Sequence, residues 1–538
     1  MAQNSSQSIN NLFRELYAFG DSLSSYGDYG SYIQKTVLAP TAQPEWSGVT
    51  FSNANFGCQL GLRNRLGIPT NTQKAPAGLD IPTPYYTLAN SYVATPGIGT
   101  LKAPSFAIGG ATSTTGSLYD VITVPGDGSV PLSTAYPKLA QTGVQNQILT
   151  AWRQGVRPAS NELTVIQGGS NDLLIASIEE NPDIEGVLDQ VMINLRDDLT
   201  VQLRACGSRQ LMTFALADFR GVVDGVPYQM PFLSGLLLQA ASDPDAPEWV
   251  TSWASFVKTG GLEQFQTDYA AMVQELKAEF PYAALTYFSP EFGTNWQSYG
   301  SRLGNFASYD INNTVSFAQS ANEPLTEDQT DNFLYFDTIH NTQSGQEMTA
   351  QAMLLTLEAN QDAIEAATLE DKKSGNQRNN RLVATKHNSE LLGKAGNDRL
   401  IGRQGNDALS GDRGSDFLTG ADGTDWLQGG EGSDRMQGGK GADFFAWEAK
   451  DAKSHWQDTI TDFQGKQGDR LGITAILDGD NPFANPGWTY IGNHKFTGSA
   501  AELRFSGGWL QGDVDGDRRA DLRIALPHVA VFNTDWIS

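Results

Sequence analysis

The stretch from residue 393 to residue 446 reads GKAGNDRLI, GRQGNDALS, GDRGSDFLT, GADGTDWLQ, GGEGSDRMQ and GGKGADFFA, six consecutive nonapeptides in one register. In every unit positions 1 and 4 are glycine, position 6 is aspartate and position 8 is leucine, methionine or phenylalanine. A repeat this short builds one structural element per unit, and each element is stabilised by stacking on its neighbours. The period therefore predicts an all-β parallel β-roll over residues 393–446.

The residue types in the unit point to a metal. Glycines permit a tight turn whose carbonyl groups face inward, and aspartate supplies a hard oxygen of the kind that calcium prefers. The expected calcium ligands are Asp398, Asp407, Asp416, Asp425, Asp434 and Asp443. Without a cation their stacked charges repel, and one apolar side chain per unit cannot offset that repulsion and the loss of chain entropy. We therefore expect the roll to need structural calcium in order to fold.

The units resemble the RTX repeats of Gram-negative exported proteins. The resemblance implies a type I secretion apparatus as partner and an extracellular location, with the roll unfolded inside the cell. Residues 1–6 lack the basic stretch and following apolar run of a cleaved signal peptide. The last residues, 535–538, resemble the acidic-then-apolar terminus of type I substrates. Export without a cleaved signal peptide is the expectation.

A second acidic stretch lies downstream of the repeats. Asp513, Asp515 and Asp517 are consistent either with one more calcium site or with a charged hairpin. Arg518 stands where an EF-hand loop needs glycine, and Ile524 stands where it needs the final glutamate. The stretch is therefore not an EF-hand, and the other two interpretations stay open.

Composition divides the 538 residues into several parts. We place an α/β domain at residues 1–370, a polar linker at 371–392, the roll at 393–446, and a β extension with the secretion signal at 447–538. The formal net charge of −25 argues against a nucleic-acid partner. No stretch approaches the roughly 18 consecutive apolar residues that a spanning helix needs, so we expect no transmembrane segment.

The first 370 residues alternate short apolar runs with longer amphipathic runs. Residues 15–19 and 163–166 are typical of buried parallel strands, whereas residues 187–204 and 262–280 are typical of helices. This alternation predicts an α/β fold. The two cysteines, Cys58 and Cys206, are interpreted as buried thiols or as one disulfide.

Residues that suit nucleophilic catalysis stand at the ends of the predicted strands. Ser22 follows the first strand, at the carboxyl edge where α/β sheets bind ligands. His340 is the only histidine in the first 370 residues, and a serine nucleophile needs such a base. Asp337 precedes it by three residues, close enough to orient the imidazole. The glycine-rich segments 105–112 and 167–172 supply candidate oxyanion donors.

In this order, these four segments resemble the blocks of the SGNH or GDSL hydrolase family over residues 14–355. The resemblance implies a three-layer, flavodoxin-like α/β domain. It also implies that Ser22 is the nucleophile, with His340 as its base and Asp337 as the acid that orients the base. The implied oxyanion hole consists of the backbone N–H groups of Ser22 and Gly110 and the side chain of Asn171.

The combined features predict a secreted carboxylic ester hydrolase, an esterase or lipase that uses calcium only in its roll and no cofactor in catalysis. The expected substrate is an ester or a lipid, and phospholipase, short-chain esterase and carbohydrate acetylesterase all remain open. Ser25 and Asn341 depart from the family pattern, which bears on the substrate rather than on the reaction. The alternative is a non-catalytic, calcium-dependent surface or matrix protein that binds an acyl or glycan ligand.

Overall fold

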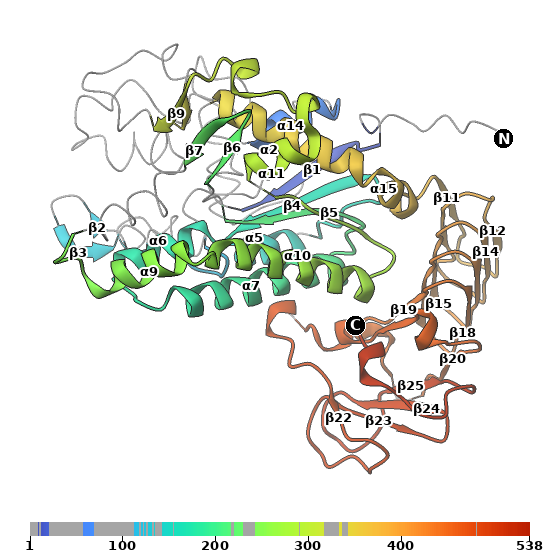
Figure 1. Ribbon diagram of the computed structural model, residues 1–538. Helices are drawn as coiled ribbons and strands as arrows, with labels where there is room; N and C mark the ends of the chain where they lie inside the picture. Colours follow the sequence, from blue (N-terminus) through green and yellow to red (C-terminus); the bar gives the residue numbers. More distant parts are fainter. Residues whose placement is uncertain are drawn as a thin grey trace.

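The computed structural model contains an α/β domain packed against a β-roll (Figure 1). The residues that it describes are 9, 12–20, 58–68, 112–117, 120–121, 123–124, 127–131, 134, 143–153, 155–216, 220–229, 243–289, 291–316, 333–335, 343–453, 455–479 and 481–538. Among them, no helix combines the length and the apolar character needed to cross a membrane.

A parallel sheet forms the centre of the α/β domain. Its strands, in spatial order, are β1 (Glu15–Phe19), β4 (Glu162–Gly168), β5 (Gln210–Ala215) and β8 (Ala284–Tyr287). Every residue of β4 and β5 is buried, which is what continuous apolar runs do in a sheet covered on both faces. The strands expected at residues 15–19 and 163–166 are confirmed.

Helices cover both faces of this sheet, so the domain has three layers (Figure 1). On one face lie α5 (Val144–Arg153), α6 (Ser170–Ile178), α7 (Ile184–Arg204), α9 (Glu248–Lys258) and α10 (Gly261–Glu279). On the other face lie α2 (Cys58–Arg65), α11 (Phe292–Tyr299), α14 (Gln343–Ala359) and α15 (Gln361–Ala367). The helices expected at residues 187–204 and 262–280 correspond to α7 and α10.

Short strand pairs accompany the sheet. They are the antiparallel pairs β2 (Thr123–Val124) with β3 (Asp127–Pro131) and β6 (Arg220–Val223) with β7 (Val226–Gln229), and the parallel pair β9 (Asn313–Ser316) with β10 (Phe333–Tyr335). Cys206 follows α7 and is a free, buried thiol, and burial raises its pKa to about 12. The disulfide with Cys58 that the sequence left open therefore does not form.

The roll is a coil of two facing parallel sheets. One sheet contains β11 (Asp371–Ser374), β13 (Ser389–Leu392), β15 (Ala408–Arg413), β17 (Trp426–Glu431), β19 (Phe444–Ala446) and β21 (Arg470–Gly472). The other begins with β12 (Arg381–Val383), β14 (Arg399–Gln404), β16 (Phe417–Asp422), β18 (Arg435–Lys440) and β20 (Asp458–Ile460). Leu400 pairs with Leu418, and Leu409 pairs with Leu427. Two nonapeptides therefore complete one turn of the coil.

Position 8 of each unit fills the space between the two sheets. These side chains are Leu400, Leu409, Leu418, Leu427, Met436 and Phe445, all at most 1% exposed. Full burial of such a side chain stabilises a fold by about 1.5–3 kcal/mol. The predicted narrow apolar core is confirmed.

The interpretation of residues 371–392 as a linker is wrong. These residues form β11, β12 and β13, which are the first strands of both sheets. Leu382 and Leu391 occupy position 8 of the same nine-residue register, but Asn380 and Ser389 replace the aspartate of position 6. Asn380 lacks the negative charge of aspartate, but its backbone N–H donates to Asp398 Oδ1 at 2.6 Å. This is the same bond between successive turns that the repeat aspartates make, so the coil geometry is kept.

Beyond the repeats, the second sheet continues as a β extension. β20 pairs in parallel with β25 (Leu522–Ala525), which is followed across the sheet by β24 (Trp509–Asp513), β23 (Glu502–Ser506) and β22 (Thr489–Tyr490). β23, β24 and β25 pair in antiparallel fashion. Their apolar side chains join the same core as the repeat leucines, so the roll and its extension form one unit.

One of the two sheets of the roll packs against the α/β domain. The side chains at position 7 of the repeat differ between this sheet and the other one. Position 7 of the second, fourth and sixth units is Ala408, Trp426 and Phe444, and all three line this contact. In the first, third and fifth units it is Arg399, Phe417 and Arg435, all exposed. Because successive units alternate between the two sheets, only the sheet with the apolar set faces the domain.

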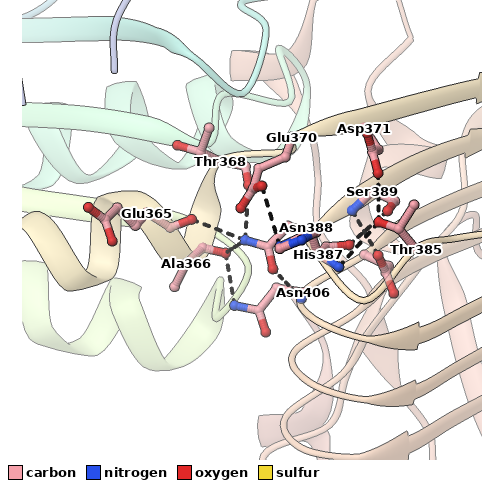
Figure 2. Close-up of polar contacts among 11 residues, drawn as sticks. Glu365, Ala366, Thr368, Glu370, Asp371, Thr385, His387, Asn388, Ser389 and Asn406 are labelled. Carbon is pink, nitrogen blue, oxygen red and sulfur yellow. Dashed lines mark hydrogen bonds and ion pairs between the residues drawn. The ribbon is translucent and has the colours of Figure 1, made fainter. Parts of the chain in front are cut away.

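The junction between the two parts is tied by asparagines of the roll (Figure 2). The Asn388 amide donates to the carbonyl oxygens of Glu365, Ala366 and Thr368 at 2.9–3.0 Å, and the Asn406 amide donates to Ala366 O at 2.8 Å. The last carbonyls of a helix have no partners within it, so these side chains cap the carboxyl end of α15. The first roll turns are thereby fixed to the last helix of the domain.

Candidate functional site

The α/β domain places Asn171 at the carboxyl edge of its sheet. β4 ends at Gly168, Gly169 turns the chain, and α6 begins at Ser170. Gly169 has a φ of +100°, and a Cβ there would lie 2.8 Å from the Val191 side chain, so only glycine fits the turn. Asn171, the predicted oxyanion donor, is therefore buried in the first turn of α6.

Gly20 directly follows the neighbouring strand, β1, at the same edge. β1 pairs with β4 in parallel, with Phe19 opposite Ile166, so the chain leaves both strands side by side. The side chain of Gln147, on α5, holds Gly20 by two hydrogen bonds. Gly20 N donates to Gln147 Oε1 at 2.9 Å, and Gln147 Nε2 donates to Gly20 O at 2.9 Å. Gly20, two residues before Ser22, is thus held in place through both its N–H and its carbonyl group.

A third segment, residues 112–117, is bonded to the residue after Asn171. Ser113 N donates to Asp172 Oδ2 at 2.9 Å, and Ser113 Oγ donates to Asp172 Oδ1 at 2.8 Å. Burial raises the pKa of Asp172, whereas these two bonds act in the opposite direction. The structure thus brings together the three described segments that flank the predicted oxyanion donors and nucleophile.

Four of the predicted catalytic residues lie outside the described residues: Ser22, Gly110, Asp337 and His340. Their described flanks are Gly20, Thr112, β10 and α14. Gln147 and Asp172 were not predicted from the sequence. Each acts on a partner far away in the chain, 127 residues for Gln147 and 59 for Asp172, so no local motif marks them.

The aspartates of the repeats form two ladders, one along each sheet. In the first four units the backbone N–H of the aspartate donates to Oδ1 of the aspartate 18 residues further on, at 2.6 Å from Asp398 to Asp416 and 2.8 Å from Asp407 to Asp425. The ladders extend past the repeats, because Asp434 N donates to Asp458 Oδ1 and Asp443 N donates to Asp469 Oδ1. All six predicted ligands are stacked and buried.

The second carboxylate oxygen of each repeat aspartate has no hydrogen-bond partner. These buried atoms are Oδ2 of Asp398, Asp407, Asp416, Asp425, Asp434 and Asp443. Each lies against the glycine of position 1, where a side chain would fill the space. A Cβ on Gly393 would be 2.5 Å from Asp398 Oδ2 and 2.8 Å from the carbonyl oxygen of Gly411. Unpaired carboxylate oxygens beside inward carbonyls are the donor set that fits calcium.

Electrostatics of the ladders favour a cation. Burial, reinforced by neighbouring carboxylates, raises the pKa of Asp425 and of Asp434 to about 8. Burial likewise raises the pKa of Asp443 to about 7 and that of Asp416 to about 6. In the folded roll without an ion, the charged form of several of these carboxylates is therefore unfavourable. A bound divalent cation would stabilise the charged form.

A further acidic cluster lies in the β extension. Carboxylate oxygens of Asp513, Asp515 and Asp521 lie within 4.8 Å of one another, an arrangement that could hold a metal ion. Asp517, which the sequence grouped with the first two, is not a member of this cluster. Asp521 therefore takes the place that the sequence gave to Asp517.

Comparison with known proteins identifies the repeat segment. Residues 374–409, 384–418 and 419–446 match the model of the RTX calcium-binding nonapeptide repeat. Residues 374–446 are therefore an array of RTX repeats, and calcium is their structural ion. No curated protein matches the chain.

Among solved structures, two subunits of the mannuronan C5-epimerase of Azotobacter vinelandii are similar to this chain. The AlgE6R3 subunit is 24% identical, with 30% of this chain and 80% of that chain covered and a TM-score of 0.21. The AlgE6R2 subunit is 29% identical, with 29% of this chain and 90% of that chain covered and a TM-score of 0.19.

Proposed function

We propose that the chain is an exported serine ester hydrolase, an esterase or lipase whose α/β domain carries the chemistry. The observation that carries the proposal is the position of Asn171 at the carboxyl end of β4, beside the end of β1 that leads to Ser22. A buried amide in the first turn of a helix, at the edge of the sheet where α/β domains bind ligands, suits an oxyanion donor. The three layers and the parallel strand order support the flavodoxin-like SGNH architecture that the sequence resembles.

The reaction proceeds through an acyl-enzyme. Ser22 Oγ attacks the ester carbonyl carbon while His340 takes its proton and Asp337 stabilises the resulting imidazolium. The Ser22 and Gly110 N–H groups and the Asn171 amide hold the oxyanion. The C–O bond then breaks, and the alcohol leaves with the proton from His340. Water attacks the acyl group with His340 as base, which releases the acid and restores Ser22.

The RTX array supports an extracellular site of action reached through a type I secretion apparatus. Calcium modules outside the cell have dissociation constants of about 10⁻⁴ to 10⁻³ M. At cytosolic calcium levels such a roll stays unfolded, and it folds on arrival outside. Calcium therefore acts on folding and not in the bond-breaking step.

The test is hydrolysis by the calcium-loaded full chain. Substrates are p-nitrophenyl esters of graded chain length, phospholipids and acetylated sugars. Ser22→Ala should abolish turnover, whereas Ser255→Ala, an exposed serine of α9, should leave it unchanged. Failure of the wild-type protein to hydrolyse any of these esters would contradict the proposal and favour the non-catalytic, calcium-dependent binding protein.

A further inference from the structure

A network of hydrogen-bonded polar side chains holds the described segments that flank the predicted catalytic residues. Gln147 on α5 and Asp172 on α6 each make two hydrogen bonds to a segment that flanks a predicted catalytic residue. Gln147 is 1% exposed, whereas Asp172 is only partly buried. Ser113 and Asn194 complete the network, which we call the positioning frame (Gln147, Asp172, Ser113 and Asn194).

Asp172 is the part of the frame that connects the two predicted oxyanion segments. It follows Asn171 in α6, and its partner Ser113 follows Gly110 by three residues. Asn194 Nδ2 donates to Ser113 Oγ at 2.9 Å, while that hydroxyl donates to Asp172 Oδ1. The Ser113 hydroxyl thus accepts one hydrogen bond and donates another, and together these two bonds fix the orientation of the side chain.

α5 connects this pair of segments to the nucleophile segment. At its first residue, Val144 N donates to Thr112 O at 2.9 Å, and one turn later Gln147 holds Gly20. Gly143 lies so close to the carbonyl of Thr114 that a Cβ there would overlap it. The amino end of one helix therefore contacts both the 112–117 segment and the segment that leads to Ser22.

We propose that Asp172 and Gln147 are positioning residues, which fix the described segments that flank Ser22 and Gly110 relative to Asn171. The inference rests on the proposed ester hydrolysis. Catalytic groups must stay within about 0.5 Å of their productive positions. A misplacement of about 1 Å costs on the order of a hundredfold in rate, so the frame acts on turnover more than on substrate binding.

The test compares Asp172→Ala, Asp172→Asn and Gln147→Ala in the calcium-loaded full chain. Asp189→Ala is the matched control, because Asp189 is an exposed carboxylate on α7. We expect kcat on a soluble p-nitrophenyl ester to fall about a hundredfold in both alanine variants, with KM changed by less than about threefold. Asp172→Asn, which keeps one acceptor oxygen, should recover part of the loss.

A second readout does not depend on activity. Hydrogen exchange of the amides of residues 112–117 should be at least about tenfold faster in Asp172→Ala than in the control. A folded Asp172→Ala protein with wild-type kcat, or with unchanged exchange in this segment, would overturn the inference. If the wild-type protein hydrolyses no ester, the proposed function itself fails and the positioning role fails with it. Exchange would then show separately whether Asp172 holds the segment.

Discussion

The Tyr282 ring, just before β8 of the α/β domain, lies 4.8 Å from the Phe444 ring in β19 of the roll, at an interplanar angle of 69°. Both side chains are buried, and the Arg209 guanidinium stacks on Tyr282 at 5.4 Å. On the same interface Arg204 pairs with Asp478 at 2.8 Å. The roll therefore contacts the amino ends of the strands, opposite the edge that carries Asn171, and shares apolar core with the domain.

Phe444→Ala should destabilise the calcium-loaded protein by about 3–5 kcal/mol, because it removes a buried aromatic side chain and leaves a cavity between the two parts. The measurement is urea unfolding of the full chain. Phe417→Ala is the control, since Phe417 occupies position 7 of another unit and is 52% exposed. Its effect should stay within about 0.5 kcal/mol. Equal effects of the two substitutions would contradict the described docking face.

Asp416→Asn should weaken calcium binding to the roll by about tenfold or more, because it removes one ligand charge. The substitution keeps an acceptor for the hydrogen bond from Asp398 N, so the ladder itself is preserved. Isothermal titration with calcium measures the effect. Asp422→Asn, an exposed aspartate paired with Lys440, should bind calcium like the wild type. An unchanged affinity in Asp416→Asn would remove this carboxylate from the ligand set.

In the absence of calcium, acidification should stabilise the roll. The pKa values of Asp416, Asp425, Asp434 and Asp443 in the folded roll are raised to about 6–8 from the usual 3.8. A raised folded-state pKa gives a stability contribution that is complete below the unfolded value and is lost as pH rises through the folded value. Far-UV circular dichroism of the calcium-free protein should therefore show more β structure at pH 5 than at pH 8.

With calcium the pH dependence should reverse. The ion needs deprotonated carboxylates, so protons compete with it and its affinity should fall as pH is lowered from 8 to 6. Calcium titrations at the two pH values measure this change. An affinity that rises on acidification would show that the aspartates are not the ligands.

Asn380→Asp should extend the calcium ladder by one residue. Asn380 occupies position 6, its N–H donates to Asp398 Oδ1, and its own Oδ1 lies beside Gly375, where it accepts a hydrogen bond from Asn376 N at 2.7 Å. One added site stabilises by about 1.4 kcal/mol at a calcium concentration ten times its dissociation constant. Thermal unfolding in calcium measures the gain. Asn493→Asp, at an exposed position of the β extension, should show none, and an equal gain there would contradict the assignment.

The roll was predictable because its nine-residue sequence period corresponds to half a turn of the coil. Each glycine and aspartate recurs every nine residues, and the ladders follow from that period. The first turns were missed because Asn380 and Ser389 stand in place of aspartate. Asp458 and Asp469 were missed because inserted residues lengthen the spacing from 18 to 24 and 26. Position 7 did not reveal the docking face, because Phe417 is as apolar as Trp426 and Phe444 and yet is exposed.

The α/β domain was predictable to a smaller extent. Apolar runs give β1 and β4, and the strand-to-helix turn at Gly169 places Asn171 at the carboxyl end of β4. The contacts of Gln147 and Asp172 depend on how α5 and α6 pack behind the sheet, which no local pattern encodes. Ser22, Gly110, Asp337 and His340 remain predictions, because they lie outside the described residues.

Covalent labelling of Ser22 tests the central claim most directly. The calcium-loaded full chain is treated with a p-nitrophenyl phosphonate, which reacts with an activated serine as an ester does, and its peptides are analysed by mass spectrometry. We predict one phosphonate on the peptide that contains Ser22, and loss of that label in His340→Ala. A wild-type protein without this label, or with the label on another residue, would contradict the account.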